Sequence, residues 1–149
     1  MLKIKKIKEN KKAYRALLLL ADPYEPMLDR YLSDGEMYVL FQDEEPVCEA
    51  VMTAAQGTLC ELKNLATAPE KQGQGFASHL VRWLLEQYRS SYTGMLVGTS
   101  DSNISFYETL GFSYSHTVPN FFPDHYPDPL WDNGSLCVDM LYLKYDFSL

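Results

Sequence analysis

The middle of the chain contains the stretch Leu65-Ala66-Thr67-Ala68-Pro69-Glu70-Lys71-Gln72-Gly73-Gln74-Gly75-Phe76-Ala77. Before it, the run from Thr58 to Asn64 predicts a strand. After it, apolar residues recur at helical spacing from Phe76 to Tyr88, which predicts a helix. Two glycines therefore lie in a turn between a strand and a helix. The free N–H groups at the positive end of that helix point at whatever lies above the turn, and an anion such as a phosphate is their natural ligand.

The glycine pattern alone is not specific, so other phosphate-binding turns have to be considered. No Gly-Lys-Ser/Thr follows Gly75, which excludes a Walker A loop. A dinucleotide-binding fingerprint is also excluded, because its third glycine would fall near His79 and because the turn does not belong to the first strand–helix unit. A pyrophosphate cradle of another kind remains, alongside a plain flexible turn with no ligand.

Length and composition describe a globular protein. The chain has 149 residues, 46% of them hydrophobic, which is enough for one domain over residues 1–149. Its apolar run at 16–20 is too short to span a membrane, and the lysine-rich N-terminus lacks the apolar segment of a secretory signal. The three cysteines show no metal-ligand spacing and are expected to be reduced. We therefore expect a cytoplasmic protein without a metal and without a membrane partner.

Charge is distributed unevenly along the chain. The net charge is −7, yet seven of the thirteen basic residues precede Ala16, so the remainder has six basic and nineteen acidic residues. The part of the chain from Ala16 onward therefore lacks the basic surface that binding of nucleic acid requires. It suits a cationic substrate, although the acidic residues can equally serve to keep the surface soluble.

The order of the elements predicts an α/β (α+β) fold. The pattern is β-α-α-β-β-β-α-β-α-β-β, with a proline-rich loop from Pro119 to Ser135 and a last strand from Leu136 to Phe147. In the strand before the glycine turn the apolar alternation changes face near Asn64. A β-bulge or a splay between strands is expected there.

A second motif lies about thirty residues after the first: Asn103-Ile104-Ser105-Phe106-Tyr107-Glu108-Thr109-Leu110-Gly111-Phe112. The segment Gln72–Ala77 resembles the Q/R-x-x-G-x-G/A motif of the GNAT superfamily of acetyl-CoA-dependent N-acetyltransferases. The run from Asn103 to Phe112 resembles the second motif of that family. The resemblance implies a mixed, mostly antiparallel central sheet of about seven strands, splayed at the CoA site and flanked by about four helices.

The resemblance also implies a set of donor-binding residues for acetyl-CoA. The strand end would pair its backbone with the pantetheine arm, the turn would hold the pyrophosphate through its amides, and one asparagine would bind the arm. These residues are Leu65, Ala66, Thr67, Gln72, Gly73, Gln74, Gly75, Phe76, Ala77 and Asn103.

Direct attack of an amine on the thioester needs one group to accept a proton and one to donate a proton to the leaving thiolate. The resemblance implies that Tyr107 is the proton donor. Glu61 is the candidate base, because some members of the family carry at this place, four residues before the pantetheine-binding strand end, a Glu that works through water. Other roles stay open at this point: Tyr107 as a packed helical aromatic, and Glu61 as a solvated strand carboxylate.

The acceptor is the least defined part of the site. Long loops in compact domains are usually functional, and Asp124, Tyr126 and Trp131 of the 119–135 loop could hold an ammonium group by charge and cation–π contact. A structural loop or a homodimer contact is the alternative. The sequence thus predicts transfer of an acetyl group to a primary amine of a small cationic molecule. Acetylation of a peptide or protein N-terminus or lysine, or a non-catalytic acyl-CoA sensor, are the competing interpretations.

Overall fold

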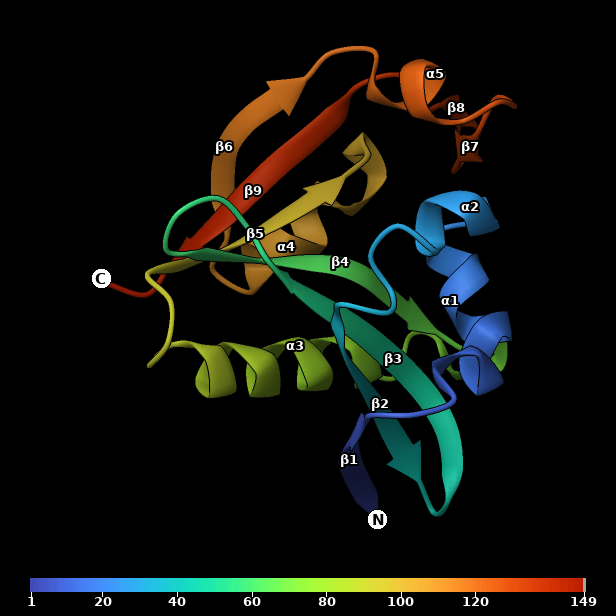
Figure 1. Cartoon of the computed structure of the whole chain (residues 1–149), viewed down its shortest axis with the longest axis vertical. Coiled ribbons are helices and arrows are strands. Elements are labelled where there is room, and N and C mark those ends of the chain that lie inside the picture. Colours follow the sequence, from blue (N-terminus) through green and yellow to red (C-terminus); the bar gives the residue numbers. More distant parts are fainter. Residues whose placement is uncertain (149) are drawn as a thin grey trace.

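One mixed sheet of seven strands contains both the first and the last strand of the chain (Figure 1). The computed structural model describes residues 1–148, so Leu149, the last residue of the expected domain, lies outside it. The strand order is β1-β2-β3-β4-β5-β9-β6, and every neighbouring pair is antiparallel except β4 and β5. The strands are β1 Leu2–Ile7, β2 Glu36–Gln42, β3 Glu45–Ala54, β4 Leu59–Thr67, β5 Gly94–Thr99, β6 Ser113–Val118 and β9 Met140–Asp146. A separate hairpin joins β7 Trp131–Asp132 to β8 Ser135–Leu136.

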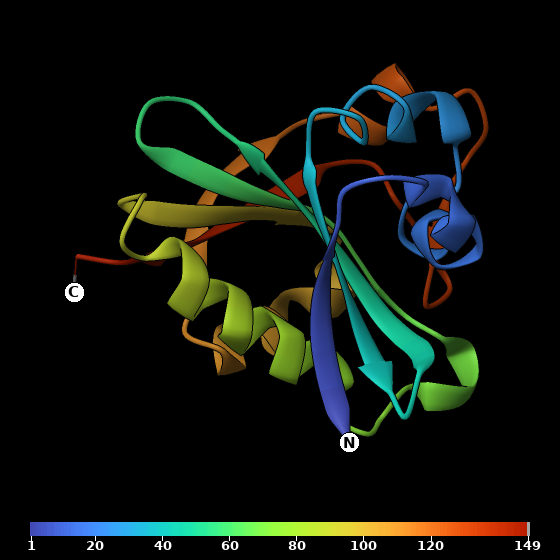
Figure 2. The same ribbon diagram turned by 60° about the horizontal axis from the view of Figure 1, so that its bottom comes forward.

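Helices cover the two faces of the sheet (Figure 2). They are α1 Arg15–Ala21, α2 Glu25–Leu28, α3 Phe76–Tyr88, α4 Ile104–Thr109 and α5 Phe121–His125, with 3-10 turns η1 Lys11–Tyr14, η2 Pro69–Lys71 and η3 Asp101–Asn103. Helices α3 and α4 pack on one face, and α1 and α2 on the other. The expected α/β fold is confirmed, and the helix count exceeds the expected four by the one-turn helix α5, which lies in the expected loop. No helix among residues 1–148 has the length and apolar character needed to cross a membrane.

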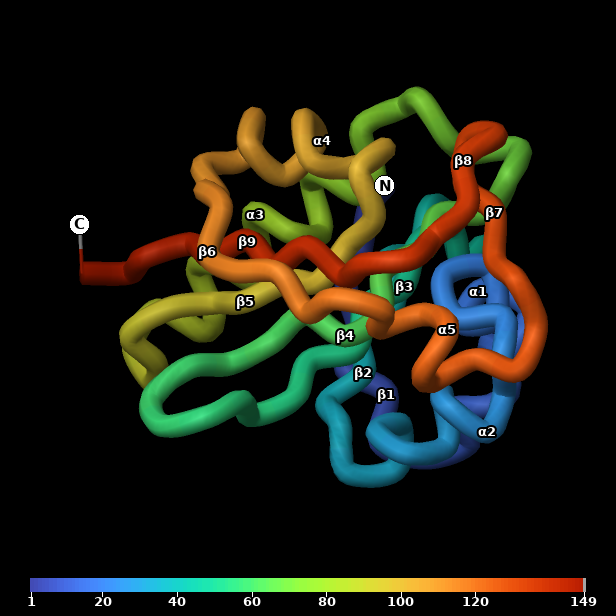
Figure 3. The backbone as a smooth tube through the Cα atoms, turned by 90° about the horizontal axis from the view of Figure 1, so that it is seen from above, coloured from blue at the N-terminus to red at the C-terminus, as the bar shows by residue number. Residues whose placement is uncertain are grey.

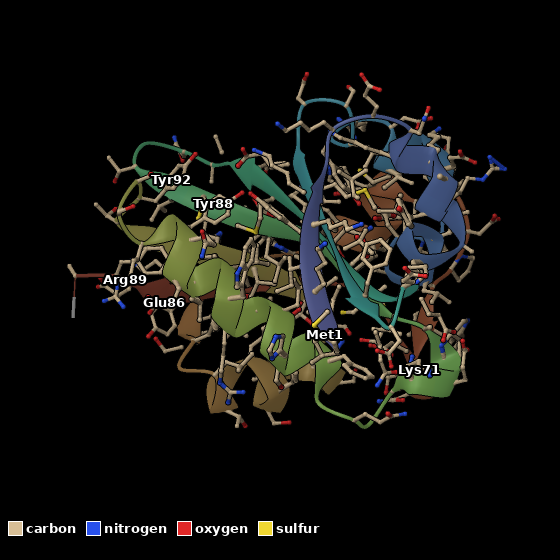
Figure 4. The ribbon with its side chains drawn as sticks, turned by 90° about the horizontal axis from the view of Figure 1, so that it is seen from below. Met1, Lys71, Glu86, Tyr88, Arg89 and Tyr92 are labelled. Atoms are coloured by element: carbon tan, nitrogen blue, oxygen red, sulfur yellow. The ribbon has the colours of Figure 1, made fainter. Side chains whose placement is uncertain are left out.

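The larger core lies between α3 and the sheet. Leu80 and Leu84 project from α3 at the predicted helical spacing and are fully buried against Met52 and Met95 of the strands. Burying each such side chain stabilises the fold by roughly 1.5–3 kcal/mol relative to leaving it exposed. At the far end of α3, Tyr88 stacks on Tyr92 with ring centroids 5.9 Å apart (Figure 4). The helix is therefore held along its whole length, and its first turn is fixed next to the end of β4.

The opposite face has a smaller core that contains one buried acid. Leu18 and Leu28 of the α1–α2 segment cover Val39 of β2 on this face. Glu49 of β3 lies opposite Val39 in the sheet register, and its side chain is 0% exposed. Neither of its carboxyl oxygens has a hydrogen-bond partner among the described residues. Burial raises the pKa of Glu49 well above its usual range.

Strand β4 carries the predicted irregularity. Val51 of β3 pairs with Asn64, whereas the next residue, Met52, pairs with Leu62, so Lys63 is the extra residue of a β-bulge. The parallel pairing of β4 with β5 ends at Leu62 and Val97, although both strands continue. The expected bulge and splay are both confirmed, and they open the sheet beside the strand end that precedes the glycine turn.

The segment after β6 differs from the expected long loop and last strand. It contains helix α5 and strand β7, and β9 begins only at Met140. The reason is local pairing. The backbone N–H of Cys137 donates to Leu130, and the carbonyl of Val138 accepts from Phe122, so these two residues bond to the preceding loop and not to a sheet neighbour. The expected strand over 136–147 is thus wrong at its start: Leu136 belongs to the hairpin strand β8, 137–139 lie in no strand, and β9 covers Met140–Asp146.

Candidate active site

The exposed backbone of β4 forms one wall of the site. Ala68 donates its N–H to the carbonyl of Val47 at 2.9 Å, and Ala66 lies opposite Glu49 in the same register. Hydrogen-bonded pairs alternate along an antiparallel ladder, so Ala66 directs its backbone groups at β3. Leu65 and Thr67 consequently direct theirs to the other side, where β5 no longer pairs. Gln72 donates its side-chain Nε2 to the carbonyl of Thr67 at 3.3 Å, which connects this strand end to the turn.

The turn itself requires glycine. Gly73 and Gly75 have φ values of 78° and 85°, in the left-handed region that glycine adopts most readily. The first intrahelical bond of α3 runs from His79 to the carbonyl of Gly75 at 3.0 Å. The N–H groups of Phe76, Ala77 and Ser78 therefore lack an intrahelical acceptor and are available to an anion at the positive helix end.

Lys71 adds a positive charge at this turn, which the sequence analysis did not single out. It ends η2 immediately before the glycine pattern, and Figure 4 shows it at this corner of the molecule. Its Nζ lies 3.4 Å from Oε1 of Gln42 and 3.8 Å from Oε2 of Glu45, which orients the side chain while leaving it partly exposed. A phosphate at the helix end would experience this charge in addition to the amides.

Helix α4 brings Tyr107 to the same cleft. The ring packs between Phe106 and Phe112, with centroid distances of 5.0 and 5.6 Å. Burial, and secondarily the charge of Cys48, raises the pKa of the Tyr107 phenol, so the hydroxyl keeps its proton at neutral pH. Asn103 lies just before α4 at the end of η3 and is exposed.

These elements surround a single cleft of about 970 Å³. Most residues expected at the donor site line it: Leu65, Ala66, Thr67, Gln72, Gly73, Gly75, Phe76, Ala77, Asn103 and Tyr107. Gln74 is exposed and does not line it. The structure therefore brings the two sequence motifs together from β4, α3 and α4.

The other end of the cleft contains a buried carboxylate that no motif in the sequence indicated. Asp22, in the connection between α1 and α2, is 7% exposed and lines the cleft. Its two oxygens accept hydrogen bonds from Tyr31 at 2.8 Å and from Tyr126 at 2.9 Å. Asn64 in turn donates to the Tyr31 hydroxyl at 3.1 Å. Burial raises the pKa of Asp22, and these hydrogen bonds oppose the rise.

Glu61 lies on the same face of β4 as Asn64, two residues before the bulge residue Lys63. Its side chain is 16% exposed, and Nζ of Lys63 lies 3.6 Å from its Oε2. Burial raises the pKa of Glu61, while Lys63 and, more weakly, His116 oppose the rise. The raised pKa is what a proton acceptor near neutral pH needs. Glu61 does not line the cleft directly, so a base at this position would act through water.

The three loop residues expected at the acceptor side are placed differently from one another. Tyr126 is half-buried in the cleft, where its hydroxyl reaches Asp22. Trp131 lines the cleft mouth but is 67% exposed. Asp124 is exposed on α5 and does not line the cleft. The neighbouring hairpin is attached to η3, because Asp132 accepts hydrogen bonds from Ser100 and Ser102.

Comparison with known proteins shows to which family the chain belongs. The model of the acetyltransferase (GNAT) domain matches residues 33–114. The uncharacterized N-acetyltransferase YvbK of Bacillus subtilis (strain 168) is 32% identical over 134 residues, which cover 87% of this chain and 86% of that protein. The chain belongs to the GNAT superfamily of acetyltransferases.

Two solved structures show how closely this GNAT enzyme follows its relatives. A GNAT family acetyltransferase from Elizabethkingia anophelis with acetyl-CoA bound is 30% identical, has a TM-score of 0.92, and covers 97% of each chain. A Bacillus subtilis acetyltransferase in complex with CoA is 31% identical, has a TM-score of 0.90, and covers 98% of this chain and 99% of that one. The protein is accordingly an acetyl-CoA-dependent acyltransferase with acetyl-CoA as co-substrate.

The residues of this GNAT enzyme fit the co-substrate on structural grounds. A Cβ built on Gly73 or Gly75 would meet nothing within 4 Å, so the turn leaves open space above its amides. The thiols in the core are not alternative nucleophiles, because burial raises the pKa of Cys48 to about 11 and of Cys60 to about 12. Among residues 1–148, no three His, Cys, Asp or Glu side chains are grouped so as to hold a metal ion.

Proposed function

We propose that this GNAT enzyme transfers the acetyl group of acetyl-CoA to a primary amine of a small cationic molecule, by direct attack while donor and acceptor are bound together. The observation that carries the proposal is the open edge of β4. Its pairing with β5 ends at Leu62, and Leu65 and Thr67 then present their backbone to a cleft that also contains Tyr107 and the glycine turn. An extended pantetheine arm can add to such an edge as a short strand.

Each donor residue has a role that follows from its position. The backbone of Leu65 and Thr67 and the side chain of Asn103 bind the arm, and the amides from Gln72 to Ala77, together with Lys71, bind the pyrophosphate. The Leu65 N–H faces the cleft and is placed to donate to the thioester carbonyl oxygen as negative charge develops there. These contacts position the donor, which by itself contributes a large part of the rate.

The chemistry then requires two proton transfers. Acetyl-CoA supplies a thioester, whose C–S bond breaks as the amine nitrogen forms the new C–N bond. Glu61 accepts the proton that the nitrogen loses, through a water molecule, and its raised pKa suits this task. Tyr107 gives its phenolic proton to the sulfur, and its own raised pKa ensures that the proton is present beforehand.

A small acceptor is favoured over a peptide by the closure of the acceptor side. Tyr126 and Asp22 are 104 residues apart in the sequence, and their hydrogen bond links the two walls of the cleft. Figure 3 shows the segment with α5 beside α2, and the β7–β8 hairpin beside α1. This link narrows the space that an extended peptide would need. The acidic body of the chain favours a cationic molecule by long-range attraction. The cytoplasmic location and the homodimer stay predictions.

The proposal is tested with acetyl-CoA and a panel of amines. Calorimetry should detect acetyl-CoA binding, and release of free CoA thiol should depend on the amine added. A protein that binds acetyl-CoA but releases thiol with no amine in the panel would instead be a sensor. Intact-mass analysis of peptides and proteins after incubation identifies the third class: acetylated protein with no acetylated small amine would contradict the proposed acceptor.

A further inference from the structure

The acceptor end of the cleft contains a buried carboxyl group that has no cationic partner among the described residues. Asp22 is 7% exposed, and both hydrogen bonds from side chains to its oxygens come from uncharged phenols, Tyr31 and Tyr126. Within the described residues, no lysine, arginine or histidine nitrogen lies within 4.0 Å of its oxygens. A buried carboxylate without a cationic partner is costly to keep ionised. A cation brought by a ligand would remove that cost.

Lys63 does not fill this position. Its charge lowers the pKa of Asp22, but its Nζ lies over the ring of Tyr31, 5.4 Å from the centroid, and its ion-pair partner is Glu61 at 3.6 Å. Two buried carboxyl groups, Asp22 and Glu61, thus share the single ammonium group of Lys63. This end of the cleft therefore has room for one more positive charge.

The surroundings of Asp22 suit an organic cation better than a metal ion. Phe122 and Tyr126 line the cleft beside it, with ring centroids 5.7 Å apart, and Tyr24 packs on Tyr126 at 5.9 Å. Aromatic faces attract ammonium groups by cation–π contact. A single carboxylate with aromatic neighbours gives too few oxygen ligands for Ca²⁺ or Mg²⁺. The site thus matches one alkylammonium group.

We propose that Asp22, with the ring of Tyr126, binds a second ammonium group of the acceptor, so that the acceptor is a diamine. This inference rests on the proposed function. One amino group of the diamine is the nucleophile on the Lys63–Leu65 side of the cleft, and the other remains charged at Asp22. The distance between the two sites then selects the length of the carbon chain between the two nitrogens.

The test compares amines that differ only in the distant group. In n-pentylamine a methyl group replaces one amino group of α,ω-diaminobutane, and n-hexylamine corresponds in the same way to α,ω-diaminopentane. The kcat/KM for the better diamine should exceed that of its methyl-ended analogue by roughly ten-fold or more, as expected for a hydrogen bond to a charged group. Equal values for each diamine and its analogue would overturn the proposal.

Asp22→Asn removes the charge and keeps a carbonyl acceptor at the same place. The variant should lose the preference for the diamine, mainly through a higher KM, so that the ratio of the kcat/KM for the diamine to that for the monoamine falls by roughly ten-fold. Asp34→Asn is the matched control, because it removes the same charge from an exposed residue that does not line the cleft. A loss that is equal for diamine and monoamine would assign Asp22 a structural role and overturn the proposal.

A binding measurement separates this inference from the proposed function. Calorimetric titration of the diamine into the CoA-bound protein should show binding that Asp22→Asn weakens by roughly ten-fold, with unchanged affinity for CoA as the sign that the variant is folded. Diamine binding that depends on Asp22, without thiol release, would contradict the proposed function and leave the Asp22 site supported. Thiol release from amines whose binding does not depend on Asp22 would support the proposed function and contradict the Asp22 site.

Discussion

Replacing Glu49 with glutamine is expected to change how the stability of the protein depends on pH. Glu49 is fully buried under the α1 face of the sheet, and its carboxyl oxygens have no hydrogen-bond partner among residues 1–148. Burial raises its pKa well above the value of 4.5 expected for the unfolded chain. A carboxyl with a higher pKa in the folded state takes up a proton on folding.

The sign and size of the effect follow from this proton. Above the unfolded pKa, the folded state holds a proton that the unfolded state has lost, so the free energy of unfolding decreases as pH rises, until the folded pKa is reached. The decrease is about 1.4 kcal/mol per pH unit. Glu49→Gln has the same shape and no proton to lose. The variant should therefore gain stability relative to wild type as pH rises above the unfolded pKa of 4.5, with a slope that approaches about 1.4 kcal/mol per pH unit until the folded pKa is reached.

Urea unfolding followed by tryptophan fluorescence measures the difference, because other titrating groups contribute equally to the two proteins when they are distant from the substitution. Glu86→Gln, an exposed carboxyl on α3 labelled in Figure 4, is the control for the loss of one acidic residue. Parallel curves for wild type and Glu49→Gln over this pH range would refute the reasoning, since they would mean that folding does not change the protonation of Glu49.

Three further predictions concern the donor site and the chemistry. Tyr107→Phe should lower kcat by roughly 100-fold or more in the thiol-release assay and leave the calorimetric affinity for acetyl-CoA unchanged; an unchanged kcat would show that the phenol is not the proton donor. Gly75→Asp should abolish the binding of CoA measured by calorimetry, because it places a carboxylate at the anion site and forces an unfavourable backbone conformation at φ 85°. The control is Gly57→Asp, which also lies at a positive φ, 67°, but outside the cleft. With Glu61 as the base, the wild-type rate should rise with pH through the raised pKa of Glu61. Glu61→Gln should lose that limb of the pH–rate profile, and a profile that keeps it would assign the base elsewhere.

Much of the fold and of the donor site could be predicted because the evidence is local. Helix α3 begins and ends where the apolar spacing placed it, from Phe76 to Tyr88. The break in apolar alternation near Asn64 located both the bulge and the splay. Positive φ at Gly73 and Gly75 is a property of one turn, and a short sequence window determines it.

The segment from 119 to 139 was predicted less well, because its structure depends on which of its own residues pair with one another and on a contact to Asp22, 104 residues away. Its proline content suggested an irregular loop, yet the backbone of Phe122 finds an acceptor at Val138 and that of Cys137 one at Leu130. These two bonds connect helix α5 and the β7–β8 hairpin to the residues just before β9. Single-residue propensities contain no information about such contacts.

By itself the sequence determined the donor half of this protein. Two motifs, at Leu65–Ala77 and Asn103–Phe112, each encode a backbone conformation that their own residues impose, and together they indicate an acetyl-CoA-dependent GNAT enzyme. Only the tertiary structure showed the residues on which the proposed acceptor site rests. Asp22 becomes a buried carboxyl group without a cationic partner because α1–α2 and the segment with Tyr126 pack over the opened sheet. Burial and charge pairing are properties of that packing, and no window of the sequence contains both sides of it.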